Sequence, residues 1–152
     1  MRASSFFTRE QLARIKGAIE ESEKATSGEI RVHLETSLAG DVLDRAAWIF
    51  RRTGMQNTKH RNGVLIYLAI RNKKFAIIGD VGIHQKVPEG LWDIISQKMQ
   101  NDFKDKKFTE GLIKGILMAG EKLREYFPHQ EDDINELPDE ITFDDPDLTR
   151  IG

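Results

Sequence analysis

The chain has no cysteine among its 152 residues, so it forms no disulfide and must bind any metal through oxygen or imidazole ligands. It has no apolar run near the roughly 20 residues that a membrane-spanning helix needs. Its N-terminus also lacks the longer apolar stretch of a secretory signal. We therefore expect a cytoplasmic protein without a membrane span, although a chain trimmed of an export signal would look the same.

Motifs for several common chemistries are also absent. No glycine-rich loop ends in Gly-Lys-Ser/Thr, and the segment Gly79-Asp-Val-Gly82 lacks the G-x-G start of a nucleotide-binding turn. The four histidines include no H-x-x-x-H pair, and no EF-hand loop is present. Basic residues are scattered and not clustered with aromatic residues, so we expect no nucleic-acid partner.

Charge is unevenly distributed along the chain. The net charge is −2, but residues 129–152 hold nine acidic residues and one arginine, so residues 1–128 carry +6. Hydrophobic residues make up 39% and charged residues 32%, a balance typical of one globular domain at this length. We predict a domain over residues 1–128 and an acidic C-terminal extension over 129–152, partly packed and partly mobile, with residues 141–143 as a short strand or apolar foothold.

Hydrophobic periodicity predicts alternating helices and strands. Helices are expected over residues 8–25, 41–52, 88–104 and 109–127, with Leu43 and Ile94 among the inward-facing side chains. The first should start with a capping box between Thr8 and Gln11. In the last, Gly111, Gly115 and Ala119 form a small-residue stripe that suits close packing against a neighbour. Strands are expected over 29–36, 63–70 and 75–78.

The strand order predicts the fold class. Residues 29–36 alternate, with Ile30, Val32 and Leu34 on one face and a wet polar face of Arg31, His33 and Glu35. Residues 63–70 are almost continuously apolar, which suits a strand covered on both faces, and residues 75–78 return as a hairpin. The first two strands and the helix between them make a parallel βαβ unit. We predict an α/β fold with a mixed central sheet sandwiched between helices.

This topology gathers three acidic residues near one edge of the sheet. Antiparallel pairing of the hairpin returns Asp80 to the start of the preceding strand, and the parallel first strand begins there at Glu29. The next loop leads to Glu89 at a predicted helix start. Carboxylates are the usual ligands of calcium and magnesium. The alternative is that Asp80 and Glu89 only cap turns and a helix.

Three segments resemble the TPM domain family. They are Asn62-Gly-Val-Leu-Ile-Tyr-Leu-Ala69, then Phe75-Ala-Ile-Ile-Gly-Asp-Val-Gly-Ile83, then Phe108-Thr-Glu-Gly-Leu112 with Gly115-Ile116. The family is named for a thylakoid-lumen phosphatase, a photosystem-repair protein and a modulator of acetylcholine receptors. The resemblance covers about residues 7–128. The ending over residues 135–143 is similar to that of compact bacterial members that lack a membrane segment.

The resemblance implies a mixed sheet between helices and a divalent cation, Ca²⁺ foremost and Mg²⁺ as the other choice, bound at acidic loops. It also implies acid phosphatase activity in plant members. Many members have aspartate where Arg61 stands, and an aromatic residue where Asp80 stands. Arginine cannot coordinate a cation, so Asp80 is the substitute acid from the opposite strand. Glu89 falls where the family often has aspartate.

Three hypotheses follow for function. The first is a cation-binding domain with a regulatory or scaffolding role, in which Asp80, Glu89 and Glu29 hold the ion. The second is a metal-assisted phosphatase, with His84 as the nearest general acid or base. The third is a protein-binding module without a metal, in which the acidic extension or the helix stripes contact the partner.

Overall fold

The computed structural model describes residues 2–129 and 141–144 of the chain. The elements of this part alternate along the chain much as the periodicity predicts. The helices are α1 (Ala3–Phe6), α2 (Arg9–Glu23), α3 (Val42–Arg52), α4 (Val81–His84), α5 (Leu91–Lys104) and α6 (Phe108–Tyr126), and the strands are β1 (Glu29–Glu35), β2 (Gly63–Ala69), β3 (Lys74–Gly79) and β4 (Ile141–Phe143).

The strands form one mixed sheet in the order β3-β2-β1-β4. β1 and β2 are parallel, with Glu29 opposite Gly63 and Glu35 opposite Ala69. β3 returns antiparallel to β2, and β4 lies parallel to β1 on its other side. The predicted βαβ unit and hairpin are therefore confirmed, and residues 141–143 form the short strand expected of them.

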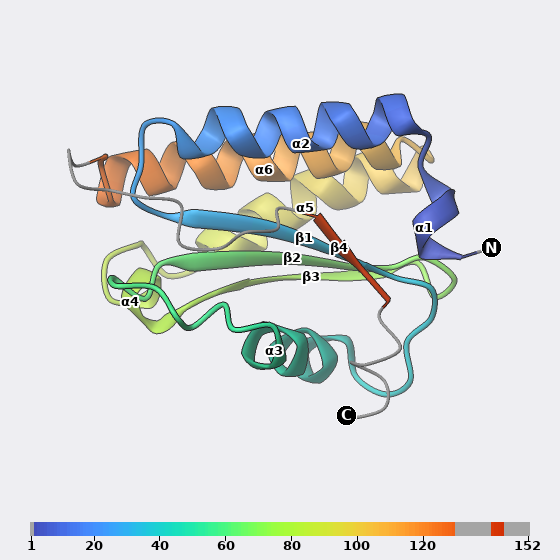
Figure 1. Ribbon diagram of the computed structural model, residues 1–152, viewed down its shortest axis with the longest axis horizontal. Coiled ribbons are helices and arrows are strands. Elements are labelled where there is room, and N and C mark those ends of the chain that lie inside the picture. The colour runs from blue at the N-terminus through green and yellow to red at the C-terminus, as the bar shows by residue number, and fades with distance from the viewer. Residues whose placement is uncertain (1, 130–140, 145–152) are drawn as a thin grey trace.

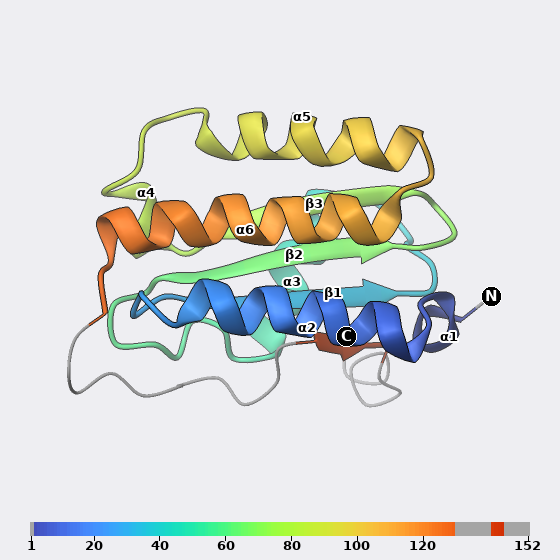
Figure 2. The ribbon, with the colours of Figure 1, turned by 90° about the horizontal axis from the view of Figure 1, so that it is seen from above.

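Helices cover both faces of the sheet, as predicted. Figures 1 and 2 show α2, α5 and α6 side by side over one face and α3 alone under the other. The larger core lies beneath the three helices and contains Ile30, Val32 and Leu34 of β1. The smaller core, between α3 and the sheet, contains Ile49, Met55 and Leu65.

Helix boundaries follow the local capping chemistry. The side chain of Thr8 accepts a hydrogen bond from the Gln11 backbone, and the Gln11 side chain accepts one from the Thr8 backbone, which confirms the capping box. The α5 helix begins at Leu91, after Gly90 in the left-handed region at φ 86°, and not at Pro88 as predicted. The inward positions predicted for Leu43 and Ile94 are wrong, since each side chain is 57% exposed.

The glycines of α6 allow close contact with the neighbouring helices. A Cβ atom added at Gly111 or Gly115 would lie under 3.0 Å from Phe103 or Met99 of α5. The same atom at Gly120 would lie equally close to the Cβ of Ser22 on α2. The small-residue stripe is thus packed inside the three-helix layer.

The acidic extension is described only around β4. The side chain of Asp144 accepts a hydrogen bond from the Thr36 backbone at 2.7 Å. The mobility predicted for part of the 129–152 extension, its last residues above all, stays a prediction, because residues 130–140 and 145–152 lie outside the described residues.

We expect Gly120→Ala to lower the free energy of unfolding, because the added methyl group forces α2 and α6 apart; overpacking of this kind costs about 1–3 kcal/mol. Gly17→Ala is the matched control in a helix interior, since nothing lies within 4 Å of its added Cβ. Its better helix propensity should stabilise the chain by about 0.5–1 kcal/mol. Chemical denaturation of both variants measures the difference, and equal stabilisation by both would contradict this packing.

Candidate functional site

The polar side chains of β1 are buried, which overturns the predicted wet face. All seven residues of β1 are buried, and among them Arg31, His33 and Glu35 are at most 4% exposed. These side chains lie on the α3 side of the sheet, while β4 covers the edge beside them. Buried polar groups must find partners, so this face of β1 holds a polar network.

Glu35 lies at the centre of that network. Its carboxylate accepts hydrogen bonds from Arg45 Nη2 at 2.7 Å and Nε at 3.0 Å, and from the Tyr67 hydroxyl at 2.5 Å. Arg45 lies on α3 and stacks over Trp48, 4.6 Å from the ring centroid. One carboxylate therefore joins β1, β2 and α3.

His33 extends the network to β4. Its Nδ1 atom lies 2.6 Å from the Thr142 hydroxyl, and its Nε2 atom lies 3.6 Å from a Glu35 oxygen. Nε2 has no hydrogen-bond partner, because 3.6 Å is too long for one. The nearby carboxylate favours the proton on Nε2, which leaves Nδ1 to accept from Thr142.

The network shifts the pKa values of its members. Burial by itself raises the pKa of Glu35, but the facing His33 imidazole and the hydrogen bonds from Arg45 and Tyr67 outweigh burial and lower the pKa to about 2. Burial, with the hydrogen bond to Glu35, raises the pKa of Tyr67. Glu35 is therefore an ionised and Tyr67 a neutral member of the network at neutral pH.

Asp80, the first predicted cation ligand, forms an ion pair with arginine. The Arg61 guanidinium donates to both oxygens of its carboxylate, at 2.8 and 2.9 Å. Asp80 also accepts from the Val81 backbone at 2.7 Å and so caps α4, while its side chain is almost fully buried. The hydrogen bond to Asp80 raises the pKa of Arg61. Both oxygens of Asp80 are thus already engaged.

The predicted edge of the sheet is confirmed for the backbone. Asp80 N donates to Gly63 O at 3.0 Å, and Glu29, which is buried, pairs with Gly63 across the parallel strands. Glu89 is exposed and lies beyond α4. Among residues 2–129 and 141–144, no three His, Asp or Glu side chains are placed to hold a metal ion.

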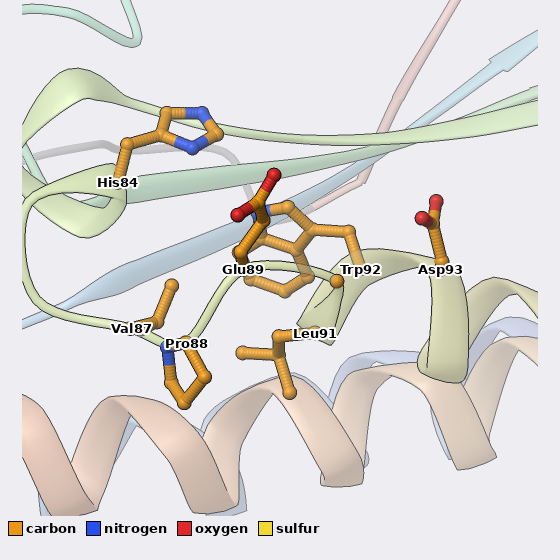
Figure 3. A pocket seen from close by; sticks show the side chains of 8 residues that line it. His84, Val87, Pro88, Glu89, Leu91, Trp92 and Asp93 are labelled. Carbon is orange, nitrogen blue, oxygen red and sulfur yellow. The ribbon is translucent and has the colours of Figure 1, made fainter.

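Glu89 lines a pocket of about 470 Å³ between α4 and α5. His84, Trp92 and Asp93 line it as well, with no lysine or arginine in the lining. Figure 3 shows the side chains of His84, Glu89 and Asp93 directed to the same side of the ribbon. We call this the acidic pocket, because its lining contains two carboxylates and no lysine or arginine. Asp93 was not among the predicted ligands.

The sequence model of the TPM domain matches residues 2–122. The chain belongs to the TPM domain family. The NMR structure of BA42 protein from the psychrophilic bacterium Bizionia argentinensis is 47% identical to this TPM domain, with a TM-score of 0.86 over 92% of this chain and 97% of that one. No curated protein matches the chain.

Two more distant structures share the fold. The N-terminal domain of a protein from P. gingivalis is 22% identical with a TM-score of 0.67, covering 84% of this chain and 85% of that one. The N-terminal domain of cg2496 protein from Corynebacterium glutamicum is 12% identical with a TM-score of 0.65, covering 88% and 83%. In this TPM domain, no helix of the described residues is long and apolar enough to span a membrane.

Sequence reasoning missed the network around Glu35, because alternation of apolar and polar residues along a strand does not show whether its polar face contacts water or a covering helix. One signal was available in the sequence. Arg31, His33 and Glu35 are all able to pair or hydrogen-bond with one another and with a neighbouring polar side chain, and the adjacent apolar strand contains one such side chain, Tyr67. The pairing of Arg61 with Asp80 had a signal too. The two positions depart together from the pattern that the resemblance implies, one from an acid to a base and the other from an aromatic residue to an acid.

We expect the stability of the chain to fall at low pH through Glu35. Because its pKa is lower in the folded state, its carboxylate stabilises the fold above about pH 4.5, and this contribution is lost as pH falls toward 2. The shift corresponds to roughly 3 kcal/mol. Denaturation of wild type and Glu35→Gln should show a stability gap that shrinks by about this amount between pH 5 and pH 2. Tyr67→Phe should give an intermediate slope, and parallel pH curves for all three proteins would contradict the role.

Proposed function

We propose that this TPM domain binds a divalent cation at the acidic pocket between α4 and α5, with Ca²⁺ as the first choice and Mg²⁺ as the second, in a regulatory or scaffolding role. The observation that carries the proposal is the pocket lining, which contains the carboxylates of Glu89 and Asp93 and no cationic side chain. Family membership supports it, since the resemblance implies divalent ions at acidic loops.

The donor set fits a cation that keeps part of its water shell. Glu89 and Asp93 offer four carboxylate oxygens on exposed side chains, which can adjust to an ion at little cost. Calcium takes six to eight oxygens, so water and backbone carbonyl groups must supply the rest. Such open sites bind weakly, and we expect a Kd of about 1 mM, as in low-affinity calcium modules.

Asp80 and Glu29 are not primary ligands in this proposal. Asp80 supports the pocket by capping α4, and it reaches a cation only if Arg61 releases it. Glu29 is buried at the start of β1 and belongs to the same edge. We therefore propose Glu89 with Asp93 as the primary ligands, and Asp80 and Glu29 as ligands only in a rearranged bound state.

Calcium should raise the melting temperature of the full chain. At 10 mM Ca²⁺ and a Kd of about 1 mM the gain is about 1.4 kcal/mol, which corresponds to about 3–6 °C for a domain of this size. Glu89→Gln with Asp93→Asn should abolish the rise. Asp44→Asn is the matched control, because Asp44 is also an exposed acid in the first turn of a helix. An unchanged rise in the double variant would count against this site.

NMR titration with calcium separates the pocket from the acidic extension. Chemical shift changes at residues 84–93 that saturate near millimolar calcium would support cation binding at the acidic pocket. Changes confined to residues 129–152 would contradict it. Arg61→Ala tests Asp80 separately. Affinity should rise in this variant if Asp80 is a ligand and stay unchanged if Asp80 is only a cap.

A metal-assisted phosphatase is the second candidate, and the position of His84 favours it. His84 lines the same pocket as Glu89, so an imidazole and the proposed ion ligands face one space. A bound cation would supply Lewis-acid polarisation of a phosphoryl oxygen, while His84 would hold the proton that is passed to the leaving group. Hydrolysis of p-nitrophenyl phosphate that survives repurification and falls in both His84→Gln and Glu89→Gln tests this activity. Turnover untouched by both substitutions would point to a contaminant.

A further inference from the structure

A second pocket lies at the opposite end of the molecule. It is about 270 Å³ in volume and is formed where the β2–β3 turn meets the end of α5 and the start of α6. Figure 2 shows this turn and the α5–α6 loop together at one end of the sheet, with α4 at the other. Neither the cation proposal nor the phosphatase candidate uses this pocket.

The wall of the pocket is aromatic. Phe75 of β3 meets Phe103 of α5 edge-on, with ring centroids 4.9 Å apart, and Phe103 stacks against Phe108 of α6 at 5.6 Å. All three rings line the pocket and remain partly exposed. Partly exposed rings around a concave space are typical of sites that take an apolar ligand body.

Three lysines line the same space. Lys73 comes from the β2–β3 turn, Lys104 from the last turn of α5 and Lys106 from the loop that follows. All three are exposed, and within the described ranges none forms a salt bridge.

The nearby acids do not cancel this charge. Asp102 is paired with Lys114 at 3.0 Å, and neither Asp102 nor Asp105 lines the pocket. The lining therefore carries three positive charges and no negative one.

Two of the lysines have a backbone conformation that residues other than glycine rarely adopt. Lys73 has φ 53° and Lys106 has φ 61°, both in the left-handed region. Glycine would adopt this conformation at lower cost. Strained residues of this kind gather at binding sites, where the surrounding structure holds them in place. Here they fix two ammonium-bearing residues at the rim of the pocket.

We propose that this pocket binds a small organic anion, in which a carboxylate or phosphate group is attached to an apolar ring system. The lysines would receive the anionic group and the phenylalanines the rings. The volume equals that of roughly nine water molecules at about 30 Å³ each, which suits a ligand of about a dozen non-hydrogen atoms. A ligand of this size is expected to bind with a Kd on the order of 0.1–1 mM.

Titration of the full chain with 1-naphthoate, followed by NMR, tests the proposal. We expect saturable shifts at residues 73–75 and 103–108 and at least tenfold weaker binding of 1-naphthalenemethanol, which has the same rings without the charge. Inorganic phosphate, which has the charge without the rings, should also bind at least tenfold more weakly. Equal binding of the naphthoate and the alcohol would overturn the proposal, as would the absence of shifts at these residues.

Two variants separate loss of binding from loss of folding. Lys73→Gly with Lys106→Gly removes two charges and relieves both left-handed positions, so the melting temperature should hold or rise while naphthoate affinity falls at least fivefold. Lys98→Gln, at an exposed lysine of α5 outside the pocket, is the control and should bind naphthoate as wild type does. Unchanged affinity in the double variant would refute the role of the lysines.

A membrane surface is the alternative that the experiment must exclude. Co-sedimentation with vesicles of phosphatidylcholine and phosphatidylserine, without any naphthoate binding, would assign the lysines to lipid headgroups and overturn the small-ligand proposal. Naphthoate binding that vesicles do not displace would support it. Calcium binding is followed at residues 84–93 and naphthoate binding at residues 73–75 and 103–108. The absence of binding at one pocket therefore does not affect the conclusion about the other.

Discussion

The fold depends on burying a charged strand in the middle of a sheet. β1 has helices on one face, α3 on the other and strands on both sides, so its polar residues have no access to water. An unpaired carboxylate in that position would cost several kcal/mol. The hydrogen bonds of Glu35 to Arg45 and Tyr67 remove that cost and join three elements. His33, whose Nε2 atom faces the same carboxylate at 3.6 Å, lies beside Thr142 of β4, 109 residues later in the chain.

The two charged pockets lie at the two ends of the sheet, where loops meet. At one end the acidic pocket between α4 and α5 presents Glu89 and Asp93. At the other end three lysines surround an aromatic wall. The pockets therefore have linings of opposite charge. The α4 helix and the β2–β3 turn, which border them, lie at opposite ends of the sheet (Figure 2). The two linings share no residue, so the proposed cation and the proposed organic anion would not compete for the same side chains.

The pairing of Arg61 with Asp80 joins two loops at one edge of the sheet. Arg61 has φ 50°, a left-handed conformation, and its guanidinium reaches across to the residue that caps α4. A bidentate arginine–carboxylate pair fixes both position and orientation. The Arg61–Asp80 pair thereby holds the loop before β2 and the loop after β3 together at the edge of the sheet, and the acidic pocket begins just beyond.

The sequence by itself determined the four long helices, the strands and their order, because apolar periodicity, the Thr8 capping box and the hairpin depend on residues close together in the chain. It also located the backbone edge where Glu29, Gly63 and Asp80 meet. It did not predict the four-residue helices α1 and α4. Only the tertiary structure decided which charged side chains are paired with other side chains of the protein. Whether Asp80 faces an ion or Arg61, and whether Glu35 faces water or α3, depends on which side chains the fold brings within hydrogen-bonding distance, and sequence spacing carries no record of those distances.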